Sequence, residues 1–125
     1  MKLHADRSDT HSITAYGEGW IAVNGQRHAH SLVLSAGHGA SAWPCQRFED
    51  LSTSHFELLL QRDEMPELVI LGSGARLRFV HPSLLQALVN RRIGVETMDT
   101  PAACRTFNIL AAEGRRVLAA LLVES

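Results

Sequence analysis

The chain has 125 residues and a mass of 13.7 kDa, which is the size of one ordinary domain that needs no disulfide to fold. Hydrophobic residues make up 46% of it and charged residues 20%, which excludes a disordered or low-complexity chain. Twelve Lys and Arg residues balance thirteen Asp and Glu residues, so the net charge of -1 provides no overall field for nucleic acid or an anionic membrane surface. We therefore expect no nucleic-acid partner.

Cysteine content and apolar runs indicate the compartment. Cys45 and Cys104 are too few for a disulfide framework and fit a reducing environment. The longest apolar run, residues 117–123, is far shorter than the roughly 20 residues that a membrane span requires. Asp6, Arg7 and Asp9 stand where a signal peptide would need an apolar stretch. These features predict a cytoplasmic protein without a membrane span.

The N-terminal third predicts an arm followed by a hairpin. Residues 1–11 are polar and show no period, so we expect a flexible arm before a single domain over residues 12–125. Two short extended segments flank Gly17-Glu18-Gly19. Asn24-Gly25 tolerates the positive φ values of a tight turn, which predicts that residues 26–35 return antiparallel to Trp20–Val23.

The middle of the chain predicts a helix and two strands. Ser52 can cap a helix whose apolar stripe begins at Phe56, although Ser54 provides a second possible start, and Pro66 ends it. Residues 67–71 form a continuous apolar run typical of a strand buried on both faces. Residues 75–79 alternate strictly between apolar and basic side chains, which predicts a strand with one exposed face.

The C-terminal third alternates helix and strand at lengths that suit crossover units. Pro82 begins a helix that ends before Gly94, and residues 95–98 form the next strand. Thr100 is the expected cap of a third helix, which begins at Pro101. Residues 117–123 then form a last, buried strand. The sequence therefore predicts one layered α/β domain.

Polar groups gather at the start of the third helix and predict the best candidate site. Asp99 and the free amides of the first helical turn form a hydrogen-bonding corner, and Arg105 and Asn108 share one helical face. Open α/β sheets bind ligands at the carboxyl ends of their strands, where this corner is expected. The competing interpretation is a well-capped helix with a purely structural role.

Gly72-Ser73-Gly74 follows a buried strand and belongs to the same candidate site. Glycines let backbone amides approach a phosphate, but the remaining positions of a nucleotide fingerprint are absent, and a simple backbone bend explains the glycines equally well. The candidate ligand or partner site consists of Gly72, Ser73, Gly74, Met98, Asp99, Thr100, Arg105 and Asn108.

No complete catalytic or metal signature is present in the sequence. His28 and His30 project from one strand face, but the other histidines lack ligand spacing relative to them. Cys104 has no neighbouring histidine to activate it and is expected in the core, and His81 is expected to cap a helix or lie on the surface. The basic side chains of Arg76 and Arg78 lack interleaved exposed aromatic residues. We expect no catalytic residue, no metal and no cofactor.

Several segments together resemble the Mth-938-like family, a family of domains of unknown function. They are residues 67–74, residues 94–100, the block Ala102-Ala103-Cys104-Arg105-Thr106-Phe107-Asn108-Ile109-Leu110 and residues 113–117, with Trp43 and the glycines near Trp20. The resemblance covers nearly the whole chain after the arm, and the block around residue 104 is specific.

The resemblance implies a three-layer α/β domain, with a central mixed sheet, helices on one side and a small antiparallel layer on the other. Relatives include mitochondrial assembly factors of respiratory complex I and a protein associated with adipocyte differentiation, and the chain looks like a small bacterial member. A non-catalytic protein-interaction or assembly-factor-like module is therefore the expected function. The alternative is a protein or enzyme that binds a small anionic metabolite at the Gly72, Gly74, Asp99 and Arg105 corner.

Overall fold

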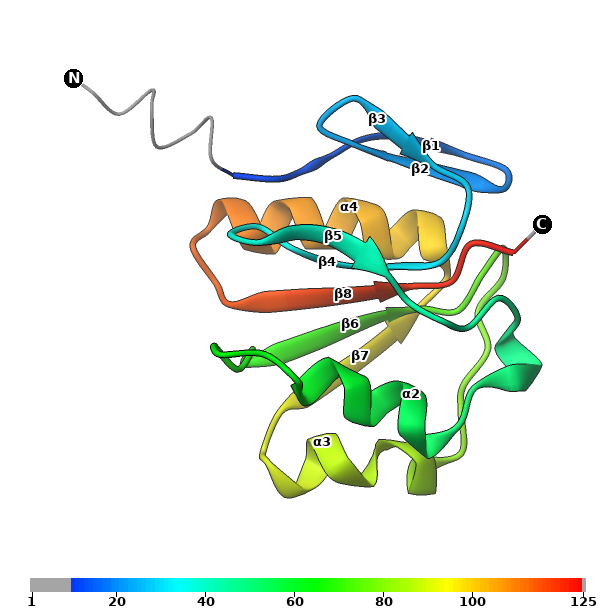
Figure 1. Ribbon diagram of the computed structural model, residues 1–125, viewed down its shortest axis with the longest axis vertical. Helices are drawn as coiled ribbons and strands as arrows, with labels where there is room; N and C mark the ends of the chain where they lie inside the picture. Colours follow the sequence, from blue (N-terminus) through cyan, green and yellow to red (C-terminus); the bar gives the residue numbers. More distant parts are fainter. Residues whose placement is uncertain (1–9, 125) are drawn as a thin grey trace.

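The computed structural model describes residues 10–124, so the arm expected over residues 1–11 falls almost entirely outside the described residues. Two sheets and three α-helices with short 3-10 turns make up this part of the chain (Figure 1). The elements in chain order are β1 (Ile13–Gly17), β2 (Trp20–Val23), β3 (Gln26–His28), β4 (Leu32–Ser35), β5 (Gly39–Ala42), η1 (Phe48–Asp50), α2 (Thr53–Glu57), η2 (Leu58–Leu60), β6 (Leu68–Gly72), η3 (Pro82–Leu85), α3 (Gln86–Asn90), β7 (Gly94–Met98), α4 (Thr100–Ala112) and β8 (Val117–Leu121).

The small antiparallel sheet β1-β2-β3 contains the predicted hairpin. Asn24 and Gly25 have φ values of 49° and 84°, as the tight turn between β2 and β3 requires. The returning strand is shorter than expected, because it ends at His28 and the chain then enters the central sheet as β4. The two strands differ in burial, because β4 is almost fully buried in the central sheet whereas β3 is mostly exposed.

The central sheet has the strand order β5-β4-β8-β6-β7 and is mixed. β6 pairs in parallel with β7 on one side and with β8 on the other. The carboxyl ends of the three strands, at Gly72, Met98 and Leu121, therefore lie side by side at the same end of the sheet. β7 is an edge strand, whereas β6 and β8 lie in the interior of the sheet, as their continuous apolar runs predict.

The layers confirm the expected α/β class, but the helices cover both faces of the central sheet. Phe56 of α2 and Leu88 of α3 pack on one face, and Phe107 of α4 packs on the other together with the small sheet. The crossover that contains α3 leads from β6 to its neighbour β7. The crossover that contains α4 leads back from β7 to β8, which lies on the other side of β6. Right-handed crossovers in opposite directions place their helices on opposite faces, and this excludes the expected one-sided arrangement.

Three local predictions need correction. Residues 75–79 form no strand, because Arg78 turns inward to an acidic partner while Leu77 and Phe79 face outward. Asp99 is the N-cap of α4, and Thr100 is already helical. The helix after Ser52 extends only to Glu57 before it tightens into η2, although Ser52 does cap it. His81 accepts a hydrogen bond from the Ser83 amide at 3.1 Å, which confirms its capping role.

Phe107→Ala tests the packing of α4 on the central sheet. Because the Phe107 side chain is fully buried, its truncation leaves a cavity and should lower the free energy of unfolding by about 3 to 5 kcal/mol. Urea denaturation measures this change. Ile109→Ala on the same helix is the control, since Ile109 is 59% exposed and its loss should change stability little. Equal effects of the two substitutions would contradict the assigned helix face.

Candidate functional site

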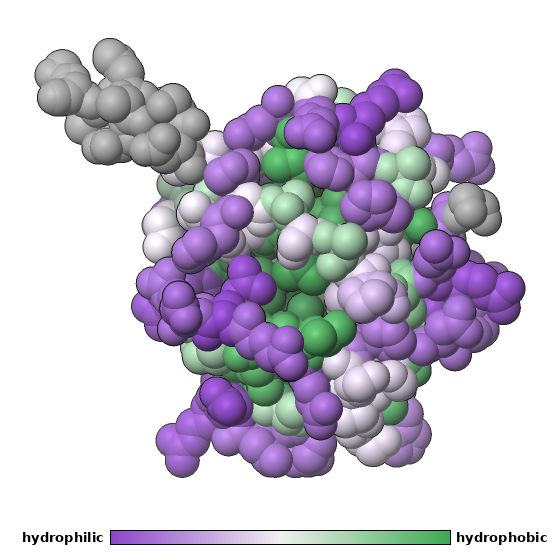
Figure 2. Space-filling view, viewed as in Figure 1, coloured by the Kyte–Doolittle hydropathy of each residue, from purple (hydrophilic) through white to green (hydrophobic). Residues whose placement is uncertain are grey.

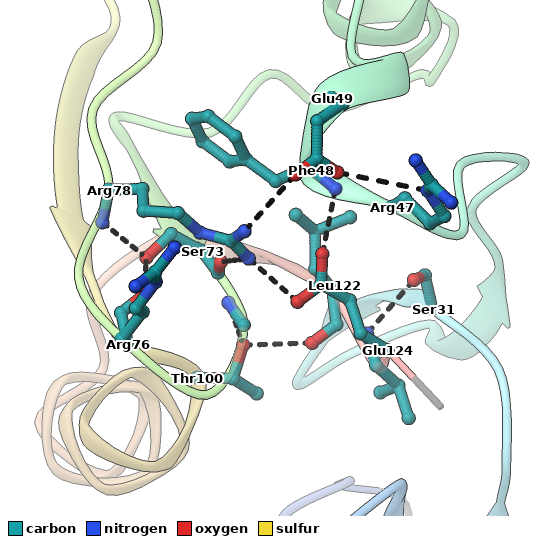
Figure 3. Close-up of polar contacts among 12 residues, drawn as sticks. Ser31, Arg47, Phe48, Glu49, Ser73, Arg76, Arg78, Thr100, Leu122 and Glu124 are labelled. Carbon is teal, nitrogen blue, oxygen red and sulfur yellow. Dashed lines mark hydrogen bonds and ion pairs between the residues drawn. The ribbon is translucent and has the colours of Figure 1, made fainter.

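The carboxyl ends of β6, β7 and β8 are joined by one buried hydroxyl group. Thr100 Oγ1 accepts a hydrogen bond from the Gly74 amide at 2.9 Å and donates one to the Leu122 carbonyl at 2.8 Å. The Thr100 amide in turn donates to the Gly74 carbonyl at 2.8 Å. The start of α4 is therefore fixed to the loop after β6 and to the residues after β8 (Figure 3).

The glycine-serine-glycine segment is packed against protein atoms on the side where its side chains would project. A Cβ on Gly72 would lie 2.9 Å from Thr100 Oγ1, and one on Gly74 would lie 2.5 Å from Glu124 Oε1. Ser73 is fully buried, its hydroxyl donates to the Arg76 carbonyl at 2.8 Å, and its amide donates to the Met98 carbonyl at 2.9 Å. In this conformation the amides of Ser73 and Gly74 are both engaged within the chain.

The first turn of α4 uses its amides internally as well. Asp99 Oδ1 accepts from the Ala102 amide at 2.8 Å, and the Asp99 carbonyl accepts from the Ala103 amide at 2.9 Å. Pro101 has no amide hydrogen to offer. The sequence thus indicated a well-capped helix at this point, and the structure contains that cap.

Asn108 and Arg105 connect α4 to the small sheet. The Asn108 side chain accepts from the Ile13 amide at 2.9 Å and donates to the Ile13 carbonyl at 2.8 Å, which fixes the start of β1. Arg105 Nη1 donates to the Tyr16 hydroxyl oxygen at 2.6 Å. Within the eight predicted site residues, Arg105 is the one whose charged group is exposed and engaged only by a side chain.

A second cluster beside this corner was not found from the sequence. Arg78 Nη2 lies 2.6 Å from Glu124 Oε1 and donates to the Ser73 carbonyl at 2.6 Å, while its guanidinium lies 4.6 Å from the centre of the Phe48 ring (Figure 3). Glu124 Oε2 accepts from the Phe48 amide at 2.8 Å. The side chains of Arg78 and Glu124 are only 19% and 22% exposed, so solvent screens this pair less than a surface pair.

Anchoring by Arg78 leaves its apolar neighbours in solvent. Leu77 is 51% exposed and Phe79 is 70% exposed, so the loop of residues 75–81 presents apolar side chains outward and holds a charged one inward. The alternation of residues 75–79 was visible in the sequence. It could not show which of the two sides faces the core, because the acidic partner of Arg78 lies 46 positions away.

An open groove of about 790 Å³ lies between the β1–β2 turn and this edge of the central sheet. Tyr16 and Trp20 contribute to one wall, and Pro101, Ala75 and Val123 contribute to the other. This volume is within the range of ordinary ligand sites, and the place is the strand-end position at which open α/β sheets bind ligands. Of the predicted site residues, Gly74 and Thr100 line the groove.

A second hollow, of about 270 Å³, lies between β5 and the α2–η2 segment and includes Trp43 and Leu59 in its lining. Figure 2 shows apolar residues in a recess of the face in view, bordered by hydrophilic residues.

Within residues 10–124, no group of three His, Cys, Asp or Glu side chains is arranged to hold a metal ion. The rings of His28 and His30 meet edge to face with centroids 5.6 Å apart. No helix in the described part of the chain has the length and apolar character needed to cross a membrane.

Both cysteines lie in the core and are free thiols. Burial raises the pKa of Cys104 to about 12, against a smaller lowering by the nearby Arg105 charge. Burial also raises the pKa of Cys45, and a backbone hydrogen bond of Arg47 opposes the shift by a smaller amount. Neither thiol is activated as a nucleophile, because the thiolate is the reactive form.

The sequence matches a family described as a protein of unknown function, DUF498/DUF598, over residues 13–122. The chain belongs to this family. It is 39% identical to a crystallised Bordetella parapertussis protein with a TM-score of 0.85, covering 91% of this chain and 96% of that one. A Bordetella pertussis protein described as a Mth938-like domain has a TM-score of 0.79 at 36% identity, covering 90% of this chain and 85% of that one. The resemblance read from the sequence is thereby confirmed.

Curated relatives of this family member include assembly factors. The human NADH dehydrogenase [ubiquinone] 1 alpha subcomplex assembly factor 3 is 32% identical over 120 residues, covering 96% of this chain and 65% of the relative. The bovine assembly factor of the same name is 34% identical over 110 residues, covering 88% of this chain and 59% of the relative. The chain thus spans about three fifths of the length of these mammalian relatives.

Thr100→Val tests the junction of the three strand ends. The substitution keeps the shape of the side chain but leaves the Gly74 amide and the Leu122 carbonyl without their buried partner, so it should lower the free energy of unfolding by about 1 to 3 kcal/mol. Asp99→Asn is the control, because it retains a capping acceptor and should cost about 1 kcal/mol or less. A larger loss for Asp99→Asn than for Thr100→Val would contradict this assignment.

The raised thiol pKa values predict slow alkylation of the folded protein. At pH 8 the Cys104 thiolate is a minor species, and burial keeps reagent from the sulfur. Iodoacetamide should therefore modify neither cysteine at the rate of a free thiol until urea unfolds the chain. Mass spectrometry over time, with and without urea, measures both rates. Rapid modification of Cys104 in the folded protein would contradict this prediction.

Proposed function

We propose that this protein is a non-catalytic interaction module that binds another protein, in the manner of an assembly factor. The observation that carries the proposal is the loop of residues 75–81, which holds Leu77 and Phe79 in solvent although the chain has an extensive core. Exposed aromatic and aliphatic anchors on one surface are typical of protein-binding sites. The assembly-factor names of the mammalian relatives support this choice.

The anchoring of the loop favours binding. The Ser73 hydroxyl donates to the Arg76 carbonyl at 2.8 Å and accepts from the Arg78 amide at 3.0 Å, and Arg78 pairs with Glu124, so the loop is hydrogen-bonded on both sides of Leu77 and ion-paired on one. A surface that is already ordered loses less conformational entropy when a partner binds. Exposed Arg76 has no ion pair within residues 10–124, and it adds positive charge beside the apolar anchors. The proposed partner surface is therefore apolar with a complementary acidic group.

A small anionic ligand at the candidate corner is the alternative. The amides of Ser73, Gly74, Ala102 and Ala103 serve the fold, so such a ligand would rely on Arg105 as its charged contact. We propose the cytoplasm as the location of the protein. We propose no nucleic-acid partner, in line with the balanced charge of the chain.

Photo-crosslinking in the native cell tests the interaction surface. A benzoylphenylalanine residue in place of Phe79 should give one dominant protein adduct, because the aromatic ring is then in the interface. The same residue in place of Ile109, which is similarly exposed on α4, is the matched control and should not give that adduct. Adducts of the same identity and yield from both positions would contradict the proposal.

Loss of the apolar anchors should remove binding without unfolding the chain. Leu77→Ser and Phe79→Ser replace exposed side chains, so each should change the free energy of unfolding by about 0.5 kcal/mol or less. The same substitutions should weaken binding of the crosslinked partner, once purified, by at least about tenfold. Ile109→Ser should leave the affinity unchanged. Titration calorimetry gives the affinities, and unchanged affinity in Leu77→Ser/Phe79→Ser would reject this loop as the interface.

A further inference from the structure

The groove between the β1–β2 turn and the start of α4 combines an apolar wall with hydrogen-bond donors at its side. Pro101, Leu122 and Val123 form apolar lining on the α4 and β8 side, and Tyr16 lines the groove from the small sheet. Arg105 donates to the Tyr16 oxygen at 2.6 Å, so the phenol proton of Tyr16 is not used in that bond. No acceptor for this proton is found within residues 10–124.

Arg105 itself has unused donors. Its guanidinium carries five N–H groups, one of which is directed to Tyr16, and no carboxylate within residues 10–124 forms an ion pair with it. Tyr16 and Arg105 together therefore present an O–H donor and several charged N–H donors on adjoining atoms. A carboxylate can accept from both at once, and hydrogen bonds to a charged acceptor are about twice as strong as neutral ones.

Acidic groups around the groove limit what can bind. Glu124 also lines it, but that carboxylate is already paired with Arg78 and with the Phe48 amide. Asp99 is occupied as the cap of α4. Glu18 lies on the β1–β2 turn, is exposed and has no ion pair within the described part of the chain, so it would repel an anion placed beside it. The donors left for an anion are those of Tyr16, which lines the groove, and of Arg105, which is bonded to Tyr16 and stands outside the groove lining.

We propose that this groove binds a small amphiphilic carboxylate, with its apolar body between Pro101 and Val123 and its carboxylate on Tyr16 and Arg105. The groove volume of about 790 Å³ is ample for such a molecule. Leu77 and Phe79 are not among the residues that line the groove, so the proposal does not depend on the protein-binding function. It extends the predicted anion corner by assigning the apolar half of the ligand and a second donor.

Octanoate is the probe, and octanol and octylammonium have the same chain with a neutral or cationic head. Octanoate at about ten times its Kd should raise the Tm by about 5 °C, with smaller effects of the other two. Amide shifts in an NMR titration should cluster at Gly17, Gly19, Gly74 and Thr100, which line the groove. Preference for octylammonium, equal binding of octanol, shifts at other residues or no binding would each overturn the proposal.

Variants separate the head group from the apolar body. Arg105→Gln and Tyr16→Phe should each weaken octanoate binding about tenfold and leave octanol unchanged. Ala75→Trp should fill the groove from an exposed position and reduce the binding of both. Arg91→Gln removes an exposed arginine outside the groove lining and should bind octanoate like the unaltered chain.

Folding and the proposed protein interface are controlled in the same series. Amide spectra should show that each variant keeps the fold, and Leu77→Ser/Phe79→Ser should retain octanoate binding even where partner binding is lost. Full octanoate affinity in a folded Arg105→Gln variant would overturn the assignment. Tighter binding at the same residues of an apolar peptide with a free C-terminus, compared with octanoate, would overturn the choice of a small amphiphile.

Discussion

The hydroxyl of Thr100 connects three parts of the chain that are distant in sequence. It accepts from the Gly74 amide and donates to the Leu122 carbonyl, so the loop after β6, the start of α4 and the residues after β8 are held together in the buried interior. The side on which Gly72 would carry a Cβ is filled by this threonine. Because buried hydrogen bonds are expensive to break, the groove beside them has one rigid wall.

The opposite orientation of Arg78 and its apolar neighbours follows from this junction. Glu124 lies two residues beyond Leu122, and its carboxylate draws the Arg78 guanidinium inward to a position beside the Phe48 ring. A chain segment that alternates can bury only one of its two sides, and here the ion pair and the buried hydroxyl of Ser73 decide which one. Leu77 and Phe79 are consequently left exposed to solvent.

Two surfaces of different character therefore meet at the same end of the central sheet. One is the ordered apolar loop, which fits the proposed role as an interaction module, and the other is the groove, which Tyr16 lines from the small sheet and beside which Arg105 of α4 bonds to Tyr16. Ala75 belongs to both, since it lines the groove and lies two residues before Leu77. The similarity of the chain to a human assembly factor accords with the first surface, and the chemistry of the donors defines the second.

Local patterns in the sequence determined the elements whose burial is uniform or whose turn chemistry is specific. The apolar runs of β6 and β8, the Asn24-Gly25 turn and the start of α4 near Pro101 were all predictable, because they depend on neighbours in the chain. The family was also recognisable from residues 67–74, 94–100, 102–110 and 113–117. The tertiary structure alone decided that α4 and α3 lie on opposite faces, that Arg78 points inward to Glu124, and that Tyr16 meets Arg105. These contacts join residues 46 and 89 positions apart, and no local pattern encodes the choice of partner over such separations.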